Sequence, residues 1–309
     1  MTSLQRSPSP GQVFRTPSPT VSILSNSSAP SFYVSSQLVD SGVQAYYDGE
    51  YDKALKSFAT ALKTQQLTLG SVDIVVAHTL GNISAVYIAM GMLDEAMQVL
   101  QECLSVKMAL RSDPNIRLPQ GCDAIVITDT LNNLGGASFL RGEYYDAMSY
   151  YQSLLKELTE GPIPGSKADI SSCLYNIGNV HCLLNELDDA LMAMAESLQL
   201  IQTTLTDGNE TPQAAEVMEK IGAIYMAQNK FDDAMTAFLE ALTITKTALG
   251  SEHVDCAVSA YNVGMAYECK GEMRRALESY NAAMEIFHKH GVDNASVDMV
   301  RQRIMQLRV

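Results

Sequence analysis

A six-residue phrase occurs six times along this chain of 309 residues. Each copy opens with Gly or Asn and closes with Ala, and the closing alanines stand 42, 51, 43, 44 and 42 residues apart. The copies are residues 49–54, 91–96, 142–147, 185–190, 229–234 and 271–276. Self-similarity at this period is typical of stacked units, each of which buries its apolar face only against its neighbours. The sequence therefore predicts one elongated repeat array.

Each copy of the phrase predicts a turn between two helices, because Gly and Asn reach positive φ at the least cost. A small residue stands seven residues before each turn residue, in the first helix. The alanine that closes the phrase stands twelve residues after this small residue, in the second helix. Two small side chains at these positions would allow the two helices to approach closely. A helical Gly costs roughly 1 kcal/mol, which close packing should recover. The small residues are Gly42, Ser84, Gly135, Gly178, Gly222 and Gly264. Four residues beyond each alanine stands a large apolar residue of the second helix's buried stripe. These large residues are Phe58, Leu100, Tyr151, Met194, Phe238 and Tyr280.

The pattern predicts six helix pairs followed by a terminal helix. The pairs are about 36–48 with 51–67, 73–90 with 93–110, 124–140 with 143–159, 168–184 with 187–205, 212–228 with 231–248, and 253–270 with 273–290. Residues 111–123 contain prolines and a glycine that predict an extended loop, either a contact site or surface slack. Residues 294–307 predict a final helix that caps the stack.

These features resemble the tetratricopeptide repeat, from about Ser36 to the C-terminus. The segments Leu131–Gly135, Leu174–Gly178 and Leu249–Asp255, together with the period of about 42, are similar to the repeat of kinesin light chains. The resemblance implies an all-α, right-handed superhelical solenoid of antiparallel helix pairs. It also implies that the first helices line a concave face.

The first 35 residues form a segment of different composition. Residues 1–31 hold nine Ser, three Thr and five Pro and no acidic residue, which predicts a disordered tail, residues 1–35, before an array at 36–309. Four residues precede a proline and are candidates for phosphorylation: Ser7, Ser9, Thr16 and Ser18. An idle linker and a transit peptide remain open as alternatives.

The charge of the array argues against nucleic acid as a partner. The chain carries 21 basic and 35 acidic residues, and two of the basic ones lie in the tail, so the array has a net charge of -16. Phosphates would be repelled by such a surface. No run of apolar residues reaches a membrane span, so we expect a protein without membrane contact.

Catalytic and metal-binding patterns are lacking in the sequence. There is no phosphate-binding loop, dinucleotide fingerprint or nucleophile elbow, so we expect no enzyme and no cofactor. The six cysteines form no Cys-x-x-Cys pair; we interpret them as core residues in a reducing compartment, the cytoplasm, with zinc or redox chemistry as the alternative. His181 stands where other repeats have a tyrosine and is interpreted as structural. His288 and His290 end a helix, where capping is favoured over a metal site, and no metal site is predicted.

One position in the first helices indicates binding. Two residues before the small residue, four of the six repeats carry asparagine, and the resemblance implies that this position contacts a bound peptide. A carboxamide offers both a donor and an acceptor to an extended backbone. The predicted contacts are Asn82, Asn133, Asn176, Lys220 and Asn262, with Asn179, Tyr175 and Tyr261 nearby. The alternative is that these asparagines only bond neighbouring helices.

The sequence therefore predicts a non-catalytic scaffold or adaptor that binds a peptide segment of a protein partner in its groove. The acidic array favours a partner with basic residues beside apolar anchors. A clamp for acidic chaperone tails is disfavoured, because only Lys220 supplies a cation in the asparagine position. The alternative from another class is a structural protein that self-associates and leaves the groove empty.

Overall fold

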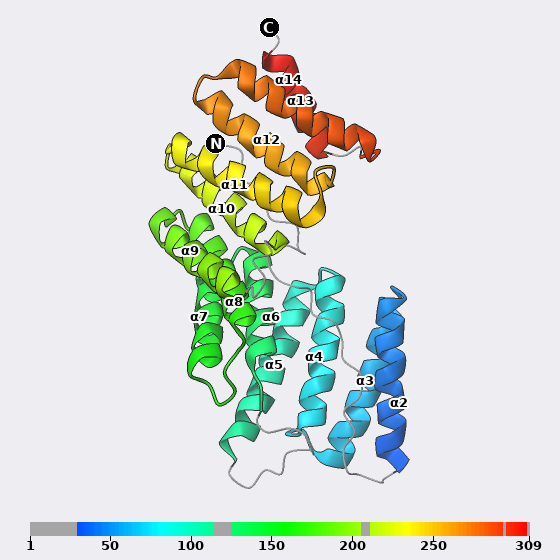
Figure 1. Ribbon diagram of the computed structural model, residues 1–309. Helices are drawn as coiled ribbons and strands as arrows, with labels where there is room; N and C mark the ends of the chain where they lie inside the picture. The colour runs from blue at the N-terminus through cyan, green and yellow to red at the C-terminus, as the bar shows by residue number, and fades with distance from the viewer. Residues whose placement is uncertain (1–29, 114–124, 205–210, 293–294, 308–309) are drawn as a thin grey trace. The chain divides into compact units, whose positions relative to one another are not determined.

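The computed structural model describes residues 30–113, 125–204, 211–292 and 295–307 (Figure 1). Within these residues the regular structure consists of thirteen helices, α2 to α14, and contains no strand. None of these helices is both long enough and apolar enough to cross a bilayer.

The contacts divide the chain into two compact units, one ending at Gly165 and the other beginning at Ser166. The first unit holds α2 (Pro30–Tyr47), α3 (Tyr51–Leu69), α4 (Ile74–Ala89), α5 (Leu93–Ser112), α6 (Thr128–Arg141) and α7 (Tyr144–Glu160). The second holds α8 (Lys167–Leu183), α9 (Leu187–Thr204), α10 (Pro212–Ala227), α11 (Phe231–Leu249), α12 (Val254–Cys269), α13 (Met273–Lys289) and α14 (Ala295–Leu307).

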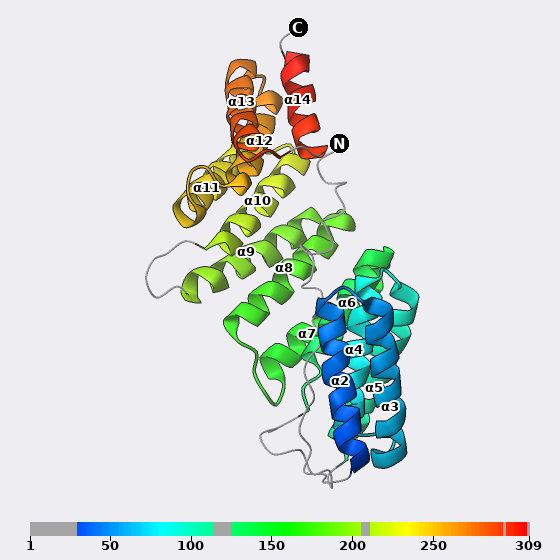
Figure 2. The same ribbon diagram turned by 90° about the vertical axis from the view of Figure 1, so that its right-hand side faces the viewer.

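Consecutive helices pack as antiparallel pairs, from α2 with α3 in the first pair to α12 with α13 in the sixth (Figures 1 and 2). Within each unit, the second helix of a pair also packs on the first helix of the next pair, as α3 does on α4 and α11 on α12. The predicted stack of helix pairs is thus confirmed inside each unit.

The six turns adopt the conformation that the phrase predicts. The glycines at the turns, such as Gly49 and Gly142, have φ values of 77° and 80°, and Asn185 and Asn229 have 61° and 60°. The next residue then donates its backbone N–H to the carbonyl five residues earlier, as Glu186 does to His181 at 2.9 Å. This is the helix-ending pattern that requires a left-handed residue, and Gly and Asn reach that conformation most easily.

The glycines of the first helices lie against the large side chains of the second helices. A Cβ added to Gly222 would stand 2.5 Å from the Phe238 ring, and one on Gly264 would stand 2.5 Å from the Tyr280 ring. The alanine and the large residue of every pair are at most 1% exposed. The small residue therefore accommodates an aromatic or other bulky partner. The predicted close approach of the two helices at this small residue is thus confirmed, and the nearest side chain to it is the large one.

Two helix starts differ from the sequence expectation. Helix α2 begins at Pro30 rather than near Ser36, so residues 30–35, assigned to the tail, are helical; proline is favoured in a first helical turn. Helix α6 begins at Thr128 rather than at residue 124. Residues 125–127 lie outside the helix, and Ile125 and Ile127 are buried at 4% and 6% while the residue between them is exposed.

A recurring polar contact links neighbouring pairs on their surface. An aspartate in the first turn of a second helix meets the residue before the turn of the next pair. Asp94 pairs with Arg141 at 3.1 Å, and Asp232 pairs with Lys270 at 2.6 Å. In the second unit, Gln228 likewise donates to Asp188 at 2.8 Å. Contacts this exposed contribute little stability and serve mainly to align neighbouring pairs.

The last helix closes the sixth pair. Val297, Val300 and Ile304 of α14 are buried in one core cluster with Tyr280 and other α13 residues. The Glu268 carboxylate accepts the Tyr280 hydroxyl at 2.7 Å and pairs with Arg303 of α14 at 3.1 Å. The predicted terminal helix therefore exists and covers the end pair with apolar residues on its inner face.

Candidate functional site

Side-chain hydrogen bonds join α8, α10 and α12, the first helices of the three pairs in the second unit. The Tyr175 hydroxyl of α8 donates to Glu216 of α10 at 2.7 Å. One turn further along α10, Glu219 accepts the hydroxyl of Ser259 in α12. Lys220 lies near Glu219 and near Cys182 of α8. We call Tyr175, Glu216, Glu219, Lys220 and Ser259 the first-helix cluster.

Glu219 is the most perturbed carboxyl group of this cluster. Burial raises its pKa to about 7, and the nearby carboxylates of Asp255 and Glu216 act in the same direction. The Ser259 hydroxyl and Lys220 oppose this shift without cancelling it. The site therefore holds a carboxyl group that is poised to change charge near neutral pH.

Replacing Glu219 with glutamine should remove a pH dependence of the free energy of unfolding. The folded pKa of about 7 exceeds the ordinary value of 4.5, so the folded state binds the proton more tightly. Protonated Glu219 therefore adds to the free energy of unfolding. This stabilisation is fully present below the pKa of the unfolded state and is lost as the pH rises through the pKa of the folded state. Glutamine stays neutral and still accepts the Ser259 hydroxyl. At pH 8 we expect the variant to be more stable than wild type by about 2 kcal/mol, with nearly equal stability at pH 4.5.

Urea unfolding at the two pH values measures this difference. Glu240→Gln changes an exposed residue of α11 and is the matched control. Its free energy of unfolding should equal that of wild type at both pH values. A Glu219→Gln effect of equal size at pH 4.5 and pH 8 would contradict the raised pKa.

Tyr175 and Asn179 form the α8 side of the cluster. Burial, followed by the adjacent Glu216 carboxylate, raises the pKa of Tyr175, so the phenol stays protonated and remains a donor. Asn179 is 5% exposed, and its side chain lies beside Tyr175, where it opposes the rise in the pKa of that phenol. The amide nitrogen of Asn179 is buried.

The predicted asparagine position is buried to different extents along the array. Asn82 and Asn176 are 4% and 5% exposed, whereas Asn133, Lys220 and Asn262 are partly exposed. These degrees of burial are compatible with asparagines that hydrogen-bond neighbouring helices and also with asparagines that bind a peptide. Their contact with a peptide stays a prediction.

Tyr261 lies apart from the Tyr175 side of the cluster. Its ring packs 5.4 Å from that of Tyr280, and Arg303 of α14 lies near its hydroxyl. The structure thus brings together Tyr175, Asn179 and Lys220 with acidic residues, but it places Tyr261 in the packing of the sixth pair.

Sequence reasoning missed Glu216, Glu219 and Ser259. A signal was present for Glu219, because it stands three residues before Gly222, the position that Tyr175 and Tyr261 occupy in the neighbouring pairs. An acidic residue at a position held by tyrosine in both neighbouring pairs indicates a specific polar contact. Its hydroxyl partner, however, lies 40 residues away.

Other residues considered from the sequence fall outside this cluster. His290 follows the last residue of α13, and its side chain contacts the Glu252 carbonyl oxygen before α12 at 2.7 Å; capping of its own helix by this side chain stays a prediction. Among the described cysteines, Cys103, Cys173 and Cys256 are buried, while Cys269 is exposed and corrects the expectation of a core residue. Cys122 and the tail positions Ser7, Ser9, Thr16 and Ser18 lie outside the described residues.

The paired helices, the left-handed turns and the glycine contacts define an α-helical repeat solenoid of protein-interaction type. Residues 38–109 and 213–289 match one tetratricopeptide repeat profile, and residues 171–208 match another. These matches span more than half of the chain, which belongs to the tetratricopeptide repeat family. This family is generally a non-catalytic protein-interaction fold. No curated protein matches the chain.

Solved structures show the same fold. The crystal structure of BtubC (BKLC) from P. vanneervenii, a kinesin light chain-like repeat protein, has a TM-score of 0.60 at 16% identity and covers 86% of this chain and 94% of its own. The apo form of RapI has a TM-score of 0.60 at 13% identity, with coverages of 90% and 97%. Pseudomonas aeruginosa pilF has 0.56 at 11% identity, with 91% and 99%.

Proposed function

We propose that this protein is a non-catalytic scaffold that holds a peptide segment of a partner protein against the first helices of its repeats. The family supports the interaction role. The observation that carries the finer proposal is the first-helix cluster, which gathers polar side chains from three successive pairs on one set of helices.

The charge of this cluster supports a basic partner. Glu216, Glu219 and Asp255 lie near one another with Lys220 as the cation close to them, and the array as a whole is acidic. Complementary charge mainly accelerates association and selects the partner. We therefore propose a peptide with Lys or Arg residues beside apolar anchors. The free cysteines fit a reducing compartment, and we propose the cytoplasm.

A basic peptide should bind more weakly as salt increases, because exposed charges are screened over about 8–10 Å at 0.1–0.15 M salt. Fluorescence anisotropy can follow the titration at 50 to 500 mM NaCl. Glu216→Gln should weaken binding by about two- to fivefold, as expected for an ion pair of up to about 1 kcal/mol. Glu196→Gln, an exposed change on the second helix α9, should leave the affinity unchanged. An affinity that is indifferent to both salt and Glu216→Gln would remove the charge argument.

A second candidate is self-association through the end of the array. Tyr33, Val34 and Tyr47 of α2 are 66%, 51% and 63% exposed. Exposed apolar side chains on an outer helix are a feature of interaction surfaces. Light scattering over a concentration series tests this candidate, and a strict monomer at every concentration would discard it.

A further inference from the structure

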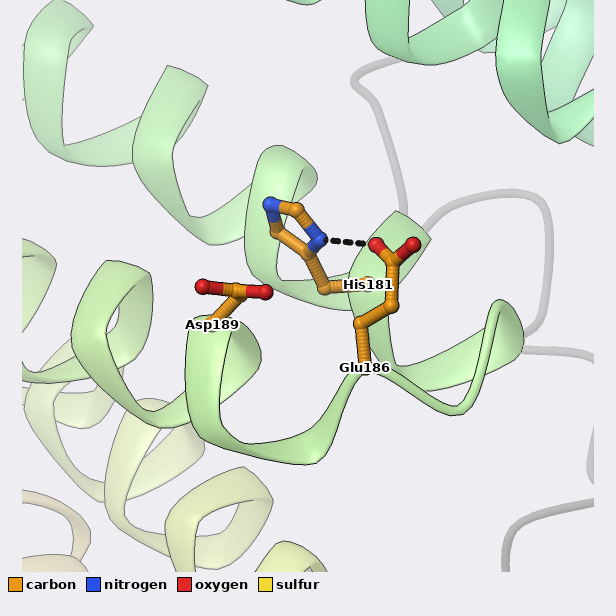
Figure 3. Close-up of side chains that lie close together, drawn as sticks. All are labelled: His181, Glu186 and Asp189. Carbon is orange, nitrogen blue, oxygen red and sulfur yellow. Dashed lines mark hydrogen bonds and ion pairs between the residues drawn. The ribbon is translucent and has the colours of Figure 1, made fainter.

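Three side chains that bind metals in other proteins meet at the turn between α8 and α9 (Figure 3). His181 lies near the end of α8, Glu186 follows the turn, and Asp189 lies in the first turn of α9. The His181 Nδ1 and Glu186 Oε2 atoms are 2.6 Å apart. One ligand atom from each residue lies within 4.8 Å of the others. The His181 side chain is 19% exposed, so the imidazole is held in place by its surroundings.

The same two positions after the turn carry opposite charges in three of the six pairs, the first, the fifth and the sixth. In the first pair Glu50 binds Lys53 at 2.7 Å, and in the sixth Glu272 binds Arg275 at 2.7 Å. In the fourth pair both positions are acidic, Glu186 and Asp189. Among the residues that the structure describes, no Lys or Arg pairs with either carboxylate.

The third pair shows what the chain does elsewhere with two acids at these positions. Glu143 and Asp146 stand there, and Arg141 supplies the cation by pairing with Glu143 at 3.0 Å. The residue before the turn that would correspond to Arg141 in the fourth pair is Leu184. The fourth pair thus has the two acids without the internal cation.

The histidine also occupies a position where other pairs bind a cation. Tyr225 and Tyr267 stand at the corresponding place, three residues after the helical glycine. Lys230 lies 5.9 Å from the centre of the first ring, and Arg275 lies 5.7 Å from the centre of the second. A positive charge at this turn is therefore a repeated feature of the array. In the fourth pair a tyrosine face is replaced by an imidazole nitrogen, which ligates metals.

We propose that His181, Glu186 and Asp189 bind a divalent transition-metal ion, with zinc as the best fit. One imidazole nitrogen and two carboxylate oxygens match the mixed ligands that zinc accepts, whereas calcium and magnesium prefer oxygen alone. Three protein ligands leave a fourth position for water. Bonds of about 2.0–2.2 Å place tetrahedral ligands about 3.4 Å apart. Small rotations of the exposed Glu186 and Asp189 side chains reach that spacing, and the ion joins the end of α8 to the start of α9.

Calorimetric titration of the untagged full-length chain with zinc chloride at pH 7.5 tests this site. We expect one strong site per chain. Because removing a group that only orients a metal ligand costs 10–100-fold in affinity, His181→Tyr should weaken binding by at least about tenfold. This variant restores the residue type of the fifth and sixth pairs, so it should fold. His288→Gln, at the exposed end of α13, is the control and should bind zinc as wild type does.

Asp189→Lys is a second variant. It gives the fourth pair an acidic and a basic residue at the two positions that Glu50 and Lys53 occupy in the first pair. It should abolish zinc binding while circular dichroism shows unchanged helicity. Cobalt absorption gives a separate readout: a spectrum of low-coordinate Co²⁺ should form with wild type and disappear with either variant. Zinc affinity that is undetectable in wild type, or unaltered by His181→Tyr and Asp189→Lys, would overturn the proposal and leave a simple His–Glu ion pair.

Discussion

Replacing Phe238 with alanine should lower the free energy of unfolding by about 3–5 kcal/mol. The Phe238 ring is 1% exposed, and it belongs to a core cluster that also holds Val263 and Ala266 of α12. Its edge lies against Gly222, which has no side chain that could fill the space left by the ring. The substitution therefore removes apolar contacts within the fifth pair and between the fifth and sixth pairs, and leaves a cavity.

Urea unfolding followed by circular dichroism measures this loss. Leu239→Ala is the matched control, because Leu239 neighbours Phe238 in the sequence but is 40% exposed; its loss should be about 1 kcal/mol or less. If Phe238→Ala costs no more than this control, the ring does not join the two pairs and the packing described here is wrong.

Replacing Gly222 with alanine should destabilise the protein, even though alanine favours helix. An added Cβ would stand 2.5 Å from one ring carbon of Phe238 and 2.6 Å from the next. Overpacking of this kind costs about 1–3 kcal/mol, against a gain in helix propensity of about 1 kcal/mol. We expect a net loss of about 1–2 kcal/mol, measured by the same urea unfolding.

Gly81→Ala is the control of opposite sign. Gly81 lies inside α4, and a Cβ there would meet nothing within 4 Å, so this variant should gain about 1 kcal/mol from helix propensity alone. Adding Phe238→Leu to Gly222→Ala should recover part of the loss, because the smaller side chain gives the new methyl group room. If both glycine variants change stability with the same sign, the contact between Gly222 and Phe238 is not what keeps alanine out.

The sequence predicted the repeat fold well because each unit repeats one local rule. Gly49 and Asn185 predict left-handed turns, because these residue types reach positive φ at the least steric cost. The spacing between the alanine and the large residue predicts the buried stripe of the second helix. What the rule does not contain is the identity of each contact partner. The spacing alone predicted close packing at Gly222 against a small alanine, and the structure adds that the Phe238 ring is its nearest neighbour.

The residues at which α6 and α2 begin were predicted least well. Ile125 and Ile127 are apolar residues that suit a helix, yet they are buried in irregular backbone before α6. Tertiary burial decided this conformation over local propensity. The start of α2 was placed too late for a related reason, since Pro30 was counted with the proline-rich tail although proline also suits a helix start.

The candidate site was only partly visible in the sequence. The asparagine position pointed to the first helices, but the contact of Glu219 with Ser259 joins residues 40 positions apart and becomes apparent only when α10 and α12 lie side by side. The three residues at the α8–α9 turn lie close in sequence but match no metal-binding motif. The candidate metal site becomes visible only when the same turn is compared across the pairs. In other pairs Lys or Arg supplies a positive charge at this turn, and in the fourth pair no Lys or Arg among the described residues does so.

Hydrogen–deuterium exchange with and without a bound basic peptide tests whether a partner peptide lies on the first helices. We expect slower exchange in α8, α10 and α12, centred on Tyr175, Glu216 and Ser259, with α9, α11 and α13 unchanged. Protection confined to the second helices α9, α11 and α13, or to the exposed face of α2, would contradict it.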